Sequence, residues 1–206
     1  DQFTKSGSAP GKSCAIGEIP IAIGGVEASL RRFAHYDHWD DRVRRSILVD
    51  SGADALLYGM GEESILQVAK AMAGGTLKDK LPGIRGACFM SAELPEGFDE
   101  IPSFDEVQSS RRAYAQAYLS QYREQDPVRG KPLAQLHDGR WLCQNRPGMP
   151  LTRQAMDRVY ALPYTRNWHP VYDEAGGIPA LEEVKFSITG TRGCFGACSF
   201  CALTFH

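Results

Sequence analysis

The stretch ADALLYGMGEESILQVAKAMAGG (53–75) contains a strand signal, a tight turn and a helix signal in immediate succession. Residues 53–58 form a short apolar run with a glycine on either side, which is typical of a buried strand. Residues 62–73 then place apolar side chains at helical spacing, and Gly74-Gly75 supplies a stop signal. This order predicts one strand–helix unit of an α/β sheet.

Two more strands are expected around this unit. IPIAI (19–23) precedes it, GACFM (86–90) follows it, and part of 27–39 is expected to be helical. Parallel neighbours need crossovers of about a dozen residues or more, and the intervals 24–53 and 59–85 provide them. We therefore predict a partial Rossmann-like parallel sheet with covering helices.

A long helix and a β-hairpin are predicted in the next region. Ser103 and Glu106 form a capping box, which opens a helix that runs to about Glu124. Residues 133–144 form two short strand candidates around Asp138-Gly139, the strongest two-residue hairpin signal in the chain. This helix and hairpin are expected to form a connecting region.

The last part of the chain predicts a short helix, a linker and a strand. Thr152 can cap a helix that ends before Pro163, and residues 163–180 are expected to form an irregular linker. VKFSIT (184–189) predicts a strand that leads into a cysteine-rich loop. We expect four parts in sequence: a flexible leader at 1–18, an incomplete α/β domain at 19–94, a connecting region at 95–180, and the start of a further domain at 181–206.

The composition excludes several classes of protein. Lys plus Arg number 23 against 25 Asp plus Glu, so no basic field indicates a nucleic-acid or membrane-surface partner. No apolar run approaches the ~20 residues of a membrane span, and the opening residues lack the apolar core of a signal peptide. Because the chain does not begin with methionine, we expect a fragment or a processed product.

Three of the six cysteines lie within eight consecutive residues. Cys194, Cys198 and Cys201 have the spacing C-x3-C-x2-C. A secreted disulfide framework would space its cysteines more evenly, so we expect a reducing cytoplasm and a metal or cluster at this triplet. The other cysteines are interpreted as buried or incidental thiols: Cys14, Cys88 and Cys143.

Thiolates hold iron–sulfur clusters, usually four to a cubane, so three thiolates leave one iron free for a ligand that is not protein. Gly196 would let the backbone approach such a cluster closely. The alternative is a structural zinc site, in which Cys198 and Cys201 form the C-x2-C pair and His206 joins Cys194. A ferredoxin-type carrier is disfavoured because it would need a fourth cysteine close by.

Two blocks of the sequence resemble the YgiQ family of radical S-adenosylmethionine (SAM) proteins. They are GGVEASLRRFAHYDHWDDRVRRSILVDSGADALLYGMGE (24–62) and EEVKFSITGTRGCFGACSFCALTFH (182–206). The resemblance implies an enzyme whose three clustered cysteines hold a [4Fe-4S] cluster, with Phe200 beside the adenine of SAM. One electron, from a flavodoxin- or ferredoxin-type reductant, would cleave SAM to methionine and a 5′-deoxyadenosyl radical.

The resemblance also implies a fold. The N-terminal part of the chain would form the later strands of a cobalamin-binding-type α/β domain. Residues 181–206 would hold the first strand and the cluster loop of a truncated radical SAM barrel. No D-x-H-x-x-G motif occurs, so a cobalamin with a histidine lower ligand is not supported.

Radical chemistry needs a closed cavity, so this chain alone is expected to be inactive. The substrate is not indicated. The alternative function is a non-enzymatic module whose cysteine site holds zinc or nothing.

Three weaker patterns favour structural interpretations. Residues 7–13 resemble a phosphate loop, but they have three residues between the glycines where that loop has four. Gly59-Met60-Gly61 favours a tight strand-to-helix turn over an anion cradle. His35, His38 and Asp41 recur at helical spacing as candidate metal ligands, but ion pairs with the neighbouring arginines are the favoured interpretation.

Overall fold

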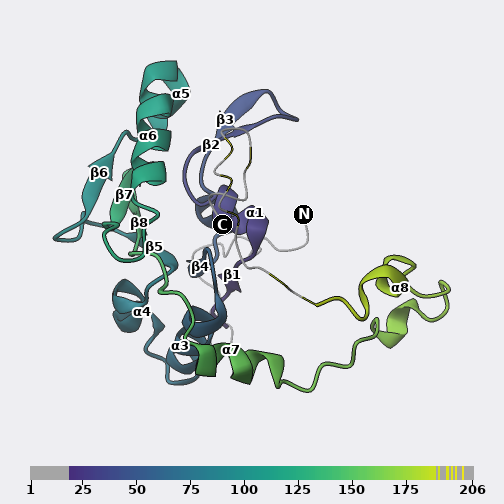
Figure 1. Ribbon diagram of the computed structural model, residues 1–206. Helices are drawn as coiled ribbons and strands as arrows, with labels where there is room; N and C mark the ends of the chain where they lie inside the picture. The colour runs from purple at the N-terminus through teal and green to yellow at the C-terminus, as the bar shows by residue number, and fades with distance from the viewer. Residues whose placement is uncertain are drawn as a thin grey trace, which may run out of the picture. The chain divides into compact units, whose positions relative to one another are not determined.

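The computed structural model describes residues 19–188, 190, 194, 196, 198 and 201. The chain divides into two compact units, one of residues 1–150 with 200–206 and one of residues 151–199. Figure 1 labels most of the helices and strands of both units.

The larger unit is built on a six-stranded mixed sheet with the strand order β1-β4-β5-β8-β7-β6. The pairs β1–β4 and β6–β7 are parallel, and the other neighbouring pairs are antiparallel. The strands are β1 (Ala22–Ile23), β4 (Ala55–Leu57), β5 (Ala87–Ser91), β6 (Asp99–Ile101), β7 (Leu133–His137) and β8 (Arg140–Gln144).

The prediction of three parallel strands is correct for the first pair and wrong for the second. Ala22 lies opposite Ala55 in a parallel pair, as predicted. Leu56 lies opposite Cys88 in an antiparallel pair, so β5 runs against β4. A long crossover is necessary for parallel neighbours, but its length does not exclude an antiparallel pair. The sheet therefore departs from the Rossmann-like, cobalamin-binding-type parallel arrangement that we expected.

The connection between β4 and β5 holds more than one helix. α3 (Glu62–Ala73) has the predicted limits, and Gly75 then adopts a φ of 65° that turns the chain. Two further helical segments, α4 (Leu77–Lys80) and η1 (Leu81–Gly83), follow before β5. The connection therefore differs from the single-helix crossover that we expected between parallel strands.

The hairpin of β7 and β8 forms with the limits that the sequence predicts. Asp138 and Gly139 have φ angles of 48° and 78°, the positive values that a type I′ turn requires at both central positions. β8 also pairs with β5, and Gln144 lies opposite Cys88. The hairpin therefore extends the main sheet, which its local sequence did not indicate.

The long helix predicted from the capping box is divided in two. Ser103 and Glu106 form the capping box as predicted, at the start of α5 (Phe104–Ser109). Ser110 then adopts an extended conformation, and its side chain accepts a hydrogen bond from the backbone N–H of Ala113. This second N-cap starts α6 (Arg111–Arg123), because a serine side chain at such a position satisfies the free amides of a new helix.

The segment between β1 and β4 contains a short helix, a small hairpin and a second helix. The expected helix within 27–39 is only α1, because a turn follows it. Residues 31–34 form this turn and 35–37 form a strand, and the Asp37 side chain then accepts hydrogen bonds from the N–H groups of Trp39 and Asp40 in the next turn. The elements are α1 (Val26–Leu30), β2 (His35–Asp37), β3 (Arg42–Arg44) and α2 (Ile47–Ser51).

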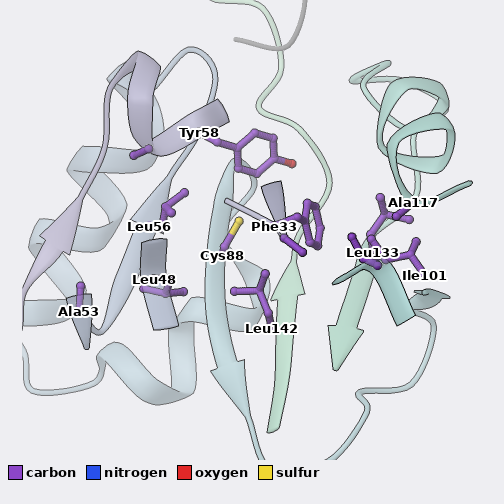
Figure 2. Close-up of a cluster of buried hydrophobic side chains, with 13 residues drawn as sticks. Phe33, Leu48, Ala53, Leu56, Tyr58, Cys88, Ile101, Ala117, Leu133 and Leu142 are labelled. Carbon is purple, nitrogen blue, oxygen red and sulfur yellow. The ribbon is translucent and has the colours of Figure 1, made fainter. Parts of the chain in front are cut away.

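Hydrophobic side chains are buried on both faces of the sheet. Leu56 belongs to one cluster, and its neighbours Ala55 and Leu57 belong to the other, as the alternation of a strand requires. All three residues are buried, which confirms the buried strand. Figure 2 shows the first cluster, in which Phe33 and Leu142 gather near the strands.

The smaller unit contains α7 (Arg153–Tyr160), η2 (Pro170–Tyr172) and α8 (Ala180–Val184). The side chain of Thr152 accepts a hydrogen bond from the N–H of Ala155, so the predicted cap of α7 is confirmed. In the part of the chain that the structure describes, no helix has the length and apolar character needed to cross a membrane.

The strand predicted at 184–189 is wrong for the residues that are described. Val184 ends α8, Lys185 and Phe186 form a turn, and residues 187–188 have no regular structure. Thr189 lies outside the described residues. A strand needs a partner for its backbone hydrogen bonds, and no described segment pairs with 184–188. The expected first strand of a radical SAM barrel is therefore not confirmed.

Candidate functional site

Gly196 lies between the first two cysteines of the C-x3-C-x2-C loop. Its N–H donates to Sγ of Cys194 at 3.4 Å, and the thiol of Cys198 donates to the Gly196 carbonyl at 3.7 Å. A Cβ atom built on Gly196 would lie 3.4 Å from Sγ of Cys194 and 3.5 Å from Sγ of Cys198. The two thiols therefore flank the α-carbon, and the absence of a side chain keeps the space between them open.

The cysteines of the loop are accessible. Cys194 and Cys198 are exposed, and Cys201 is half-buried. Cys194 and Cys198 belong to the smaller unit, whereas Cys201 belongs to the larger unit. Among the described residues no group of three metal-binding side chains is placed to hold an ion. Phe200 and His206, which the sequence suggested for SAM and for zinc, lie outside the described residues.

Two of the scattered cysteines are buried in the sheet. Cys88 and Cys143 are fully buried, on β5 and β8. Burial raises the pKa of each thiol to about 12, so both are neutral at ordinary pH. This confirms their interpretation as buried thiols. Cys14 lies outside the described residues.

The structure does not assemble His35, His38 and Asp41 into a metal site, because these residues lie on the β2–β3 hairpin and not on a helix. Ion pairs dominate this segment instead. Nη1 of Arg44 lies 3.6 Å from Asp37 Oδ2, and the Asp37 side chain is 5% exposed. The favoured interpretation, an ion-paired polar segment, is confirmed.

The predicted strand-to-helix turn at Gly59-Met60-Gly61 is also confirmed. It joins β4 to α3, and Gly59 has a φ of 67°. The N–H of Gly59 donates to Oγ of Ser29 at 3.1 Å, so this turn is tied to α1.

Sequence reasoning missed a set of polar side chains that are almost fully buried. Gln135 and His137 alternate with hydrophobic residues on β7, and they share one face of the strand with Leu133. Polar residues at alternate positions of an apolar strand are the signal that would have identified them. Buried polar side chains that the sequence analysis did not single out include Arg32, Gln135, His137, Gln144 and Asn145.

Known proteins resemble this chain over most of its length. The family model described as Radical SAM N-terminal matches residues 12–187. A UPF0313 protein of Clostridium botulinum (strain 657 / Type Ba4) is 55% identical over 194 residues, which are 93% of this chain and 30% of that protein. A UPF0313 protein of Clostridium perfringens (strain ATCC 13124) is 55% identical over 192 residues, 92% of this chain and 29% of that protein.

The chain thus spans about 30% of the length of these curated relatives. No solved structure matches it.

Proposed function

This chain belongs to the Radical SAM N-terminal family, and from that premise we propose that Cys194, Cys198 and Cys201 bind a [4Fe-4S] cluster in a full-length radical SAM enzyme. The observation that carries the proposal is the C-x3-C-x2-C loop, with two exposed thiols on either side of Gly196. Thiolates are the usual protein ligands of iron–sulfur clusters.

The chemistry of the available donors fits a site with three protein ligands. Cys88 and Cys143 are buried, and their high pKa keeps them from acting as thiolates. The loop therefore offers three sulfurs for four irons, and the amino and carboxylate groups of SAM would bind the fourth iron. When bound, the cluster supplies the electron that cleaves SAM to methionine and a 5′-deoxyadenosyl radical.

The residues of this chain would hold the cluster and tune it. The Gly196 N–H donates to Sγ of Cys194, and hydrogen bonds of this kind tune the potential of a sulfur-ligated cluster. Phe200 is proposed to lie beside the adenine of SAM. Since Cys194 and Cys198 are exposed, other parts of the full-length protein would exclude water from the loop. A flavodoxin- or ferredoxin-type protein is the proposed source of the electron.

Cluster binding is tested by replacing cysteines one at a time in the full-length protein. After anaerobic reconstitution, C194A, C198A and C201A should each lose bound iron and sulfide and the broad absorbance near ~400 nm. C143A is the matched control and should keep both. Iron that survives C198A, or that is lost in C143A, would contradict the ligand assignment.

A zinc-binding module is the competing function, and metal analysis distinguishes the two. The protein purified without oxygen should contain about four irons per chain and little zinc. One zinc per chain with no sulfide would overturn the proposal. SAM cleavage is measured in parallel, and we expect the full-length protein to cleave SAM much faster than the 206-residue chain. Equal rates would show that the chain closes its own cavity.

A further inference from the structure

Three strands of the larger unit end at the same edge of the sheet. β1 and β4 are parallel, and β8 has the same direction as β4 because both are antiparallel to β5. In parallel α/β sheets, ligands bind outside the carboxyl ends of the strands, and β1 and β4 form such a parallel pair. Glycines follow two of these strand ends. A Cβ atom built on Gly25, Gly59 or Gly61 would meet no atom within 4 Å, so the backbone there is uncovered.

A buried cation lies at this edge. The Arg32 side chain follows α1 and is only 2% exposed. Its Nε donates to Oε1 of Gln144, the last residue of β8, at 2.6 Å, and its Nη1 donates to the carbonyl of Ser29. Oγ of the same Ser29 accepts the N–H of Gly59. Arg32 is therefore connected to the ends of both β8 and β4.

No negative charge compensates Arg32 within the described part of the chain. The aromatic rings of Phe33 and Tyr58 lie 5.7 and 5.0 Å from the centre of its guanidinium, and both rings are labelled in Figure 2. Burial raises the pKa of Tyr58 and of the nearby Cys88, so both groups are neutral. Burial of an uncompensated cation is costly, and for this reason buried arginines usually contact a carboxylate or a phosphate.

The hydrogen bonds of Arg32 described above use only part of the N–H donors of its guanidinium. Arginine carries five N–H donors in a planar fork, and the bonds to Gln144 and Ser29 use only two of them. Nη2 has no hydrogen-bond acceptor among the described residues. An anion with two oxygens matches two parallel N–H groups of such a fork.

We propose that Arg32 binds an anionic group, a carboxylate or a phosphate, of a ligand held at the shared edge of β1, β4 and β8. The proposal involves none of the cysteines of the loop and does not depend on the proposed function. It rests on the buried guanidinium and not on the N-terminus of α3, because Glu62 and Glu63 in the first turn of that helix would repel an anion there.

Thermal unfolding of the 206-residue chain tests the proposal. Inorganic phosphate and malonate are titrated separately, each against sodium chloride at equal ionic strength. At least one anion should raise Tm by a few degrees in a saturable way, because a ligand that binds only the folded state stabilises it. Stabilisation by phosphate alone identifies a phosphate group, and stabilisation by malonate alone identifies a carboxylate. Equal Tm values in all three salts would overturn the proposal.

Variants locate the effect at Arg32. R32K keeps the charge but loses the planar fork, so it should lose the response to the anion. Q144E is the second variant, in case R32K unfolds: it places a carboxylate beside Nε of Arg32, which should compete with the added anion and abolish the response. R129Q is the matched control, because Arg129 is 87% exposed. It should respond as the unmodified chain does. A response that persists in Q144E or R32K would show that the anion binds elsewhere.

Discussion

His137 donates a hydrogen bond from Nε2 to Oε1 of Gln135 across 3.0 Å. The direction of this bond is fixed by the amide, since Oε1 of Gln135 also accepts the N–H of Ala34 and its Nε2 donates to the carbonyl of Pro102. The proton of the neutral imidazole is therefore on Nε2, and Nδ1 is buried without a partner among the described residues.

This arrangement makes stability dependent on pH. Burial lowers the pKa of His137 from 6.5 to about 4, so the folded chain keeps the ring neutral where the unfolded chain binds a proton. The stabilisation is fully present above pH 6.5 and is lost as the pH falls towards 4. The loss is about 3 kcal/mol at most. We expect the urea concentration at the unfolding midpoint to decrease as the pH is lowered from 7 to 4.5.

H137Q removes one of two histidines whose pKa is lowered by burial, the other being His35, and should therefore reduce this pH dependence. H38Q is the control, because His38 is exposed, and it should keep the dependence of the unmodified chain. If H137Q and the unmodified chain lose stability equally between pH 7 and 4.5, another group is responsible.

Gly196 should be required for cluster assembly. In G196V the Cβ atom lies 3.4 and 3.5 Å from the two flanking sulfurs, and the added methyl groups occupy space between the thiols. We expect the iron bound after reconstitution of the full-length protein to fall to less than half. The matched control is G190V, because a Cβ atom on Gly190 meets nothing within 4 Å. Equal iron in the two variants would contradict a close approach at Gly196.

The hairpin turn gives a prediction about stability alone. Gly139 has a φ of 78°, so G139A forces a side chain into the left-handed region and should lower the free energy of unfolding by about 1 kcal/mol. The control is G83A, where the added Cβ atom meets nothing within 4 Å. Urea denaturation of both variants measures the difference. A loss in G83A as large as that in G139A would count against the conformational explanation.

Leu56 should contribute strongly to the core of the larger unit. It is fully buried at the centre of β4, so L56A leaves a cavity and should cost about 2–5 kcal/mol of unfolding free energy. Leu66 lies on α3 and is 58% exposed, so L66A should cost much less. Similar midpoints for the two variants in chemical denaturation would indicate that Leu56 is not packed as described.

Local signals in the sequence predicted the elements that depend on neighbouring residues. The Asp138-Gly139 turn fixed both strands of its hairpin, because a type I′ turn sets the register of the residues beside it. The direction of β5 could not be predicted in this way. It depends on pairing with β8, and Cys88 meets Gln144 only in the folded sheet.

For the candidate sites too, local patterns were predictable and long-range contacts were not. The spacing of Cys194, Cys198 and Cys201 is a local pattern, and so is the glycine between the first two. The position of Arg32 was not predictable, because its burial depends on Gln144, which is 112 residues away in the chain. The adjacent Arg31 has the same side chain but is partly exposed and pairs with Glu27, so the local sequence gave no indication of the difference.

The place of β5 in the sheet has a consequence for the order in which the nascent chain folds. One side of β5 pairs with β4, which is synthesised before it, but the other side pairs with β8, which is synthesised later. Ribosomes add about 5–20 residues per second, so residues 140–144 emerge some seconds after residues 87–91. During that interval β5 presents an open edge, and a chaperone that covers it would protect the newly made protein from aggregation.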